Sequence, residues 1–188
     1  MIITADHGES FGEHPGVFLH GATLFETERH VPLVILAPGG GSSRKVVATP
    51  VSLRDLAATI VDISGFKSGS PFPGGSLVRL WDASPPGAAS DGTITSPALS
   101  ELAHEIPPYS SSPEYSVLRW PVAALVEGDW SYFRREVEVR ELLFNVREDP
   151  GELHDRVKDP AMQPTLERLR KAIARLTDGP LTPARFSP

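Results

Sequence analysis

The chain has 188 residues, of which 40% are hydrophobic and 22% are charged, and its formal net charge is −6. This composition is typical of a globular protein, and the negative charge argues against nucleic acid or an anionic membrane as the main partner. Because the chain has no cysteine, disulfides, thiolate metal ligands and a cysteine nucleophile are excluded within these residues. No apolar stretch of the sequence is long enough to span a membrane, and the composition leaves both an exported and a cytoplasmic location open.

Asp6 and His7 follow directly on a short apolar run at the start of the chain. The run predicts a strand of about four residues, of the kind that is buried in a parallel sheet. Ligands and metals gather at the carboxyl ends of strands in open α/β sheets, and a carboxylate oxygen beside an imidazole nitrogen suits a divalent cation. We therefore expect Asp6 and His7 to be metal ligands. Since this strand begins at Met1, we also expect a missing N-terminal segment that completes the sheet.

Residues 6–30 are dense in histidines and acids, namely Asp6, His7, Glu9, Glu13, His14, His20, Glu26, Glu28 and His30. A solvated polar loop with incidental histidines is one interpretation. A ligand site is the other, because Gly21 would allow a ligand to approach His20 closely and a protonated His20 could donate to an oxyanion. We expect Glu13, His14 and His30 to be hydrogen-bonding residues of the loop and Arg29 to be a structural anchor.

The next elements in chain order are a strand and a helix. Residues Val31–Ala37 predict a buried strand that ends at a proline and glycines. Residues 52–64 predict an amphipathic helix in which Ser52 is the N-cap, Asp55 is a shortened capping-box acid and Gly65 ends the helix. Residues 76–81 predict a turn or a short helix.

The second half changes character. Short strands are predicted at residues 95–102, 122–126, 130–134 and 141–146, with loops at 67–75, 83–97 and 106–113. Such neighbouring short strands with tight turns favour an antiparallel sheet. A final helix is predicted over residues 160–177 from its apolar stripe of Leu166, Leu169, Ile173 and Leu176. The predicted fold is therefore α/β: a partial sheet with helices, followed by a small antiparallel sheet packed on a C-terminal helix.

Several motifs resemble one known family when they are taken in order. The first group resembles the C-terminal metal-binding segment of sulfatases in the alkaline-phosphatase superfamily, and consists of Thr4-Ala-Asp-His-Gly-Glu9, Gly12-Glu-His14, His20-Gly21, Leu24-Phe-Glu26 and residues 31–35. The second group resembles the helix, loop and C-terminal sheet that follow, and consists of residues 52–57, Gly75-Ser-Leu77, Ser100-Glu101, Gly128-Asp-Trp130, residues 141–145 and Glu148-Asp-Pro-Gly-Glu152. The resemblance implies a partial alkaline-phosphatase/sulfatase-like sheet, with residues 1–92 in the catalytic α/β domain and residues 93–188 in a C-terminal subdomain.

The resemblance also implies roles. Asp6 and His7 match the pair that closes the metal site, usually with calcium and alternatively with manganese or zinc. His20 matches the catalytic position that contacts the transferred group of a small-molecule or glycan sulfate ester. The paired N-terminal aspartates and the Cys/Ser-x-Pro-Ser-Arg motif have no match here, since Ser42-Ser-Arg44 lacks the proline. Formylglycine is thus expected only in the missing N-terminal part, and this chain alone is expected to be inactive.

Two alternatives stay open at this point. A phosphotransferase or a phosphonate or phosphodiester hydrolase of the same superfamily would carry a similar Asp-His and His-Gly pattern. A non-catalytic remnant that acts as a binding module would keep the fold without the nucleophile.

Overall fold

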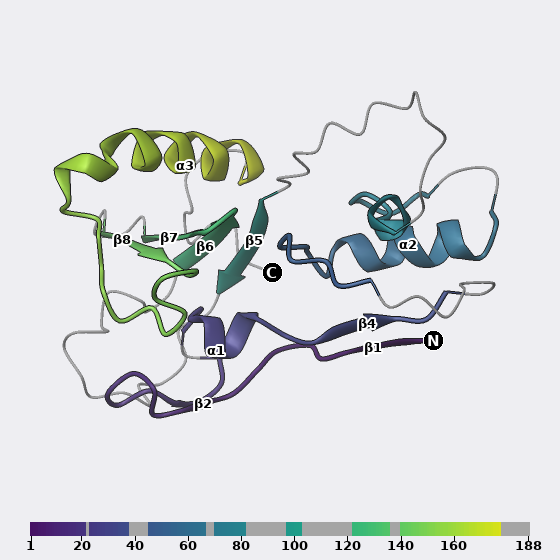
Figure 1. The fold of residues 1–188 in the computed structure, drawn as a ribbon, viewed down its shortest axis with the longest axis horizontal. Helices are drawn as coiled ribbons and strands as arrows, with labels where there is room; N and C mark the ends of the chain where they lie inside the picture. Colours follow the sequence, from purple (N-terminus) through teal and green to yellow (C-terminus); the bar gives the residue numbers. More distant parts are fainter. Residues whose placement is uncertain are drawn as a thin grey trace, which may run out of the picture.

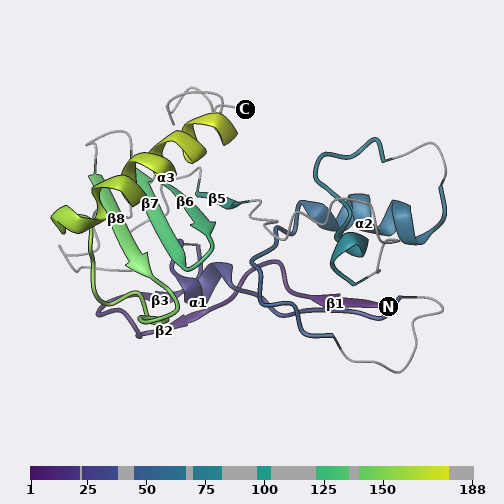
Figure 2. The ribbon, with the colours of Figure 1, turned by 45° about the horizontal axis from the view of Figure 1, so that its top comes forward.

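The computed structural model describes residues 1–21, 23–37, 45–66, 70–81, 97–102, 122–135 and 140–177. These ranges form two bodies that lie side by side in both Figure 1 and Figure 2. The sheet body consists of residues 5–30 and the described residues from 97 onward. The strand-pair body consists of residues 1–4, 31–37, 45–66 and 70–81.

The sheet body is built on four antiparallel strands in the order β5-β6-β7-β8. They are β5 (Ala98–Leu102), β6 (Val122–Glu127), β7 (Trp130–Arg135) and β8 (Arg140–Asn145). The two-residue turn between β6 and β7 uses Gly128 at φ +59°, a backbone conformation that glycine adopts without steric cost. The predicted antiparallel sheet is confirmed, while residues 95 and 96 of its first predicted strand lie outside the described residues.

Both faces of this sheet are covered. Along β6 the side chains alternate, so that Val122 and Ala124 face one cluster while Ala123 and Leu125 face the other. The helix α3 (Gln163–Leu176), which follows the short helix η3 (Pro160–Met162), covers one face with Leu166, Leu169 and Ile173. Leu24 and Phe25 cover the opposite face, where they pack on Phe133 of β7 and Phe144 of β8. The predicted C-terminal helix and its apolar stripe are confirmed.

The strand-pair body contains β1 (Ile2–Thr4) and β4 (Leu33–Ile35), which pair in antiparallel register with Ile3 opposite Val34. The strand predicted over residues 31–37 is confirmed at its centre by β4, but its predicted burial is wrong, because Val34 is 47% exposed. Ile3 is likewise 50% exposed. The two strands hydrogen-bond only to each other among the described residues, so they form a thin ribbon with little to bury it.

The helix α2 (Asp55–Ile63) and the short helix η1 (Leu77–Leu80) lie next to this strand pair in Figures 1 and 2. Both confirm elements that the sequence predicts, and Gly65 at φ +74° ends the helix as expected. The predicted capping box is wrong: the Asp55 carboxylate turns away and accepts a hydrogen bond from Gly75 N at 2.9 Å. Ser52 Oγ accepts from Arg54 N at 3.2 Å and forms only a turn before the helix.

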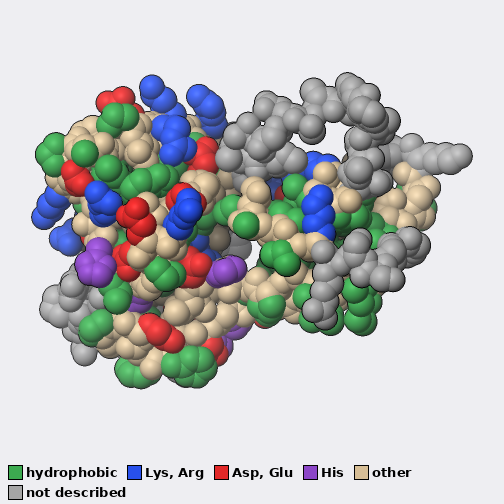
Figure 3. Space-filling view, in the orientation of Figure 1, with side chains coloured by type: hydrophobic (Ala, Val, Ile, Leu, Met, Phe, Trp, Pro, Cys, Tyr) green, Lys and Arg blue, Asp and Glu red, His purple; other side chains and the backbone are tan. Residues whose placement is uncertain are grey.

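The predicted domain boundary at residues 92 and 93 lies outside the described residues and stays a prediction, as do the loops at 83–96 and 106–113. Within the described ranges, no helix combines the length and the apolar character needed to cross a bilayer. Figure 3 shows charged side chains and histidines gathered over the sheet body, while hydrophobic side chains are prominent on the described surface of the strand-pair body.

Candidate active site

The segment that follows β1 forms a small hairpin that the sequence did not predict. Strand β2 (Ser10–Phe11) pairs with β3 (Phe18–Leu19), and the chain then reaches the short helix α1 (Glu26–Arg29). The register pairs Ser10 with Leu19, so Glu9 and His20 face each other at the base of the hairpin. The hairpin therefore brings His20 back to the end of β1, where Asp6 and His7 lie.

Asp6 and His7 form a local pair at the end of β1. The backbone N–H of His7 donates to Asp6 Oδ1 at 3.0 Å, and this bond holds the pKa of Asp6 below its usual value. His7 Nδ1 lies 2.9 Å from the carbonyl oxygen of Gly8. A carbonyl only accepts, so Nδ1 carries the hydrogen and Nε2 presents its lone pair; the same bond raises the pKa of His7.

The donor atoms of this pair fit a divalent cation. His7 Nε2 lies 3.8 Å from Asp6 Oδ2, and both side chains are open to solvent, Asp6 at 89% exposure. An imidazole whose Nδ1 donates to a carbonyl is a common arrangement for metal ligation through Nε2. In the described part of the chain, however, no group of three or more histidine, aspartate or glutamate side chains is arranged to hold a metal ion. The pair therefore supplies only part of a coordination sphere.

His20 lies directly against this pair. Its ring stacks on the ring of His7 with centroids 4.3 Å apart. Its Nδ1 lies 3.2 Å and 3.3 Å from the two carboxylate oxygens of Glu9, which can only accept from it. The other ring nitrogen, Nε2, remains available for a ligand, and the side chain is 51% exposed. The three predicted site residues thus form one cluster of side chains, while their roles stay predictions.

A buried acid beneath this cluster was not recognised as functional in the sequence. The Glu28 side chain accepts hydrogen bonds from Gly21 N at 2.8 Å, Thr23 Oγ1 at 2.5 Å and Ser10 Oγ at 3.2 Å. No sequence signal finds it, since its partners lie up to 18 residues away and no spacing rule connects them.

The backbone of Gly8 packs against the same helix. Its N–H donates to the carbonyl oxygen of Glu28 at 2.7 Å. A side chain at this position would place its first carbon 2.0 Å from the carbonyl oxygen of Thr27. A glycine after His7 is therefore required by this close approach, and the segment that carries Asp6 and His7 is held against α1.

The remaining acids and histidines of the segment have the structural roles that the sequence predicts. The Glu13 carboxylate accepts from Phe11 N at 2.7 Å, and His30 Nδ1 pairs with Glu26 Oε1 at 2.9 Å. His14 is buried, with its ring stacked on Phe25 at 3.5 Å and its Nε2 lying 3.2 Å from the carbonyl oxygen of Glu152.

Arg29 is confirmed as a structural anchor. Its guanidinium donates to Leu24 O and Ser131 Oγ, each at 2.8 Å, and forms a buried ion pair with Glu152. The Glu152 carboxylate also accepts from Glu26 N at 2.7 Å at the start of α1. Helix α1, and with it the loop that carries His20, is thereby fixed to β7 and to the loop after β8.

Comparisons with known proteins agree with these motifs. The Sulfatase family profile matches residues 1–66. Arylsulfatase K of Danio rerio is 29% identical over 174 residues, which cover 92% of this chain and 31% of the fish protein.

Solved structures show the same fold. A 2-O GAG sulfatase is 20% identical with a TM-score of 0.69, and the match covers 94% of this chain and 35% of that chain. A phosphonate monoester hydrolase from Silicibacter pomeroyi is 27% identical with a TM-score of 0.65, over 93% of this chain and 33% of that one. The expected fold class is confirmed, and the chain spans about a third of the length of each of these proteins.

Proposed function

Because this chain is a sulfatase-like segment, we propose that it supplies one side of the active site of a sulfuric-ester hydrolase. The observation that carries the proposal is the cluster of Asp6, His7 and His20, in which the two imidazole rings stack at 4.3 Å. An oxygen and a nitrogen donor for a metal thus lie beside a histidine that is free to contact an anion.

Each residue of the cluster has a distinct part in this proposal. Asp6 Oδ and His7 Nε2 would hold the divalent cation, with calcium as the leading candidate and manganese or zinc as alternatives. The bound cation would polarise the ester oxygens. His20, oriented through Nδ1 by Glu9, would donate from Nε2 to an oxygen of the transferred sulfate when its ring is protonated. The substrate would be a small-molecule or glycan sulfate ester.

The test separates the metal ligand from the sulfate contact, and it uses an active enzyme that contains this segment. Asp6→Ala is expected to lower both metal content and turnover of an aryl sulfate, with partial rescue by excess cation. His20→Ala is expected to slow turnover about 100- to 1,000-fold while metal content, measured by mass spectrometry, stays unchanged. If His20→Ala strips the metal as thoroughly as Asp6→Ala does, His20 is a ligand and the assignment is wrong.

The 188-residue chain by itself has a separate expectation. It contains no Cys/Ser-x-Pro-Ser-Arg motif, and activation without a nucleophile leaves the covalent step uncatalysed. We expect no aryl sulfate hydrolysis by the purified chain and calcium binding at millimolar level or weaker, since two ligands are few for calcium. Turnover that is lost on Asp6→Ala, or micromolar calcium binding by calorimetry, would contradict this. Tight sulfate-ester binding without turnover in the longer protein would instead favour a non-catalytic binding module.

A phosphonate or phosphodiester hydrolase is the second candidate. It is favoured by the 27% identity to the phosphonate monoester hydrolase over 93% of this chain. Rates of the longer enzyme on phenyl sulfate and on a phenylphosphonate monoester decide between the two. A kcat/KM that is higher for the sulfate supports the first candidate, and the reverse order supports the second.

A further inference from the structure

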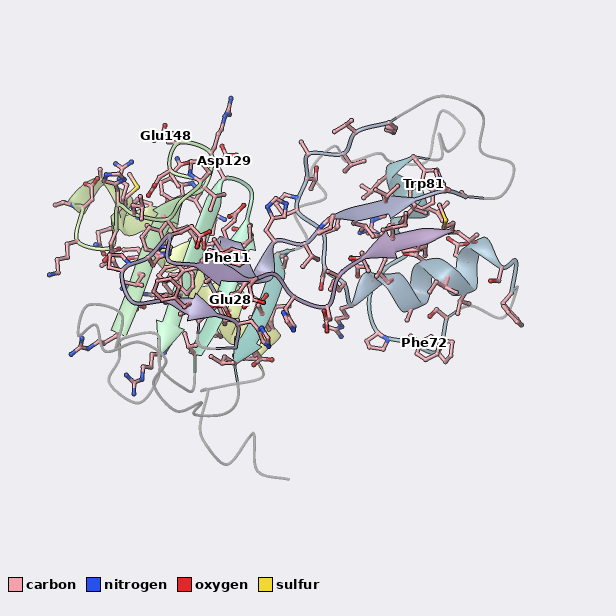
Figure 4. The ribbon with its side chains drawn as sticks, turned by 90° about the horizontal axis from the view of Figure 1, so that it is seen from below. Phe11, Glu28, Phe72, Trp81, Asp129 and Glu148 are labelled. Carbon is pink, nitrogen blue, oxygen red and sulfur yellow. The ribbon has the colours of Figure 1, made fainter. Side chains whose placement is uncertain are left out.

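We infer that Glu28 is a positioning residue that sets the place of His20 by holding the backbone of Gly21. The inference rests on the proposed function, in which His20 contacts the sulfate. Glu28 itself is buried, with 5% of its surface exposed, so it touches neither solvent nor substrate directly. Figure 4 places it beside the segment that carries Phe11, within the sheet body.

We call residues 5–30, which carry Asp6, His7 and His20, the site segment. The hydrogen bonds of Glu28 join three parts of it. One carboxylate oxygen, Oε2, accepts from Gly21 N at 2.8 Å. The other, Oε1, accepts from Thr23 Oγ1 at 2.5 Å and from Ser10 Oγ at 3.2 Å. A single side chain on α1 thus fixes Ser10 in β2, Gly21 directly after His20, and Thr23 in the stretch that leads to α1.

The bond to Gly21 acts directly on His20 because the two residues share one peptide unit. A peptide unit is planar and contains the Cα atoms of both residues, so a fixed N–H direction at Gly21 also fixes the Cα of His20. Gly21 has φ +79°, which only glycine adopts readily. The imidazole is then held from the other side by Glu9 and by the ring of His7.

The carboxylate form is what this arrangement requires. An ionised carboxylate accepts at both oxygens, whereas the amide of glutamine would turn an NH₂ group toward either Gly21 N or the two hydroxyls. Glu28→Gln therefore preserves the side-chain shape and removes at least one of the acceptors. Glu28→Asp preserves the charge and draws the carboxylate back by one methylene, so it is expected to give the same pattern at smaller size and serves if the glutamine variant does not fold.

A matched control exists in the strand-pair body. Asp55 is also buried, and its carboxylate accepts a hydrogen bond from Gly75 N at 2.9 Å. Asp55→Asn thus makes the same chemical change at another glycine amide, away from His20. It should leave the site segment unchanged.

The experiment uses the 188-residue chain and two NMR measurements. The first follows the Gly21 amide proton and the contact between the His7 and His20 rings. The second measures the Kd for phenyl sulfate. Glu28→Gln is expected to shift the Gly21 amide proton upfield, abolish the ring contact and weaken phenyl sulfate binding about tenfold, the size of one charged hydrogen bond. Asp55→Asn should do none of these.

A double variant shows whether Glu28 acts through His20. In a His20→Ala background, Glu28→Gln should weaken binding no further. An equal loss in both backgrounds, or an unchanged Gly21 shift and ring contact in both Glu28→Gln and Glu28→Asp, overturns the inference. If His20→Ala leaves phenyl sulfate binding unchanged, the role of His20 in the proposed function fails, and the Gly21 shift and ring contact still test Glu28 separately.

Discussion

The two bodies of the molecule differ in how completely their strands are buried. In the sheet body, β6 has apolar residues on both faces, and α3 and the site segment cover them. In the strand-pair body, β1 and β4 pair only with each other among the described residues, and Ile3 and Val34 are about half exposed. The buried residues described in this body gather where α2 meets η1 and the loop before it, at Asp55, Ala58, Thr59 and Leu77.

This difference shows which part of the molecule holds the candidate site in place. Asp6 and His7 follow β1 in the sequence, yet the segment that carries them is held by the sheet body. Phe25 packs against its apolar face, Arg29 pairs with Glu152, and His14 contacts the backbone of the same residue. The site is therefore supported by the part of the chain that lies more than 100 residues away, rather than by the strand from which it emerges.

Hydrogen exchange should show the largest contrast between the two bodies. Amides of β6 and β7 are expected to exchange only on global unfolding, at a free-energy cost of about 5 kcal/mol or more, whereas those of β1 and β4 should open at close to zero cost. Native-state exchange followed by NMR measures both sets in one sample. Similar protection in the two pairs of strands would remove the distinction.

Two phenylalanines test the same contrast by substitution. Phe25 is fully buried and contacts Phe133 and Phe144, so Phe25→Ala is expected to lower the free energy of unfolding by about 3–5 kcal/mol. Phe72 is 51% exposed in the strand-pair body (Figure 4), and Phe72→Ala should change it by about 0.5 kcal/mol or less. Urea denaturation gives both values. Equal losses would mean that the strand-pair body is as tightly packed as the sheet body.

The ion pair between Arg29 and Glu152 should be nearly as important. Glu152→Gln removes the buried charge partner of the Arg29 guanidinium, whose Nη2 then keeps the partly exposed Glu26 carboxylate at 3.5 Å, and breaking such a buried pair costs about 3 kcal/mol. The exposed pair of Arg147 and Asp129 is the control, since Arg147→Ala should cost about 0.5 kcal/mol or less. A small effect of Glu152→Gln in urea denaturation would show that packing, and not charge, fastens α1 to the sheet.

The smallest predicted effect depends on pH and lies wholly within the sheet body. Hydrogen bonds from Arg170 and from Tyr132 hold the pKa of Glu141 below its ordinary value of 4.5. A lowered folded pKa stabilises the protein above the unfolded value, and this stabilisation is lost as pH falls through the folded pKa.

The corresponding experiment compares two variants over that pH range. Glu141→Gln should be about 1 kcal/mol less stable than the unchanged chain at pH 7, a figure reduced for the partial exposure of Arg170. The difference should shrink below pH 4.5. Glu148→Gln, at an exposed carboxylate, should show no such trend, and a constant gap for Glu141→Gln would contradict the assignment.

Local patterns were sufficient to predict much of this fold. The alternating strands of the second half, the apolar stripe of α3 and the glycine after α2 each carry their signal within about a dozen residues. Asp6 and His7 could be selected for the same reason, because a strand end and a following glycine are adjacent to them. His20 could be selected from its neighbour Gly21 and from the family resemblance.

Features that depend on distant partners could not be predicted. Glu28 lies in a short helix and Glu152 lies in a loop, both ordinary places for an acid. Only the fold shows that each is a buried acceptor for several donors. The predicted capping box failed for the same reason, because Gly75 N, twenty residues later, competes for Asp55. Burial of β4 was overestimated because an apolar run shows what could be buried, not whether anything covers it.

The long sequence separation between Arg29 and Glu152 has a consequence for synthesis of the protein. The two residues are 123 positions apart, and at about 5–20 residues per second a ribosome needs about 6–25 s to make the intervening chain. During that interval the nascent site segment has no Glu152 to pair with Arg29 and no finished sheet on which Phe25 can pack. Its apolar and charged side chains are then exposed to chaperones and to neighbouring nascent chains. Slowed translation between these two positions should therefore increase misfolding more than an equal delay after residue 177.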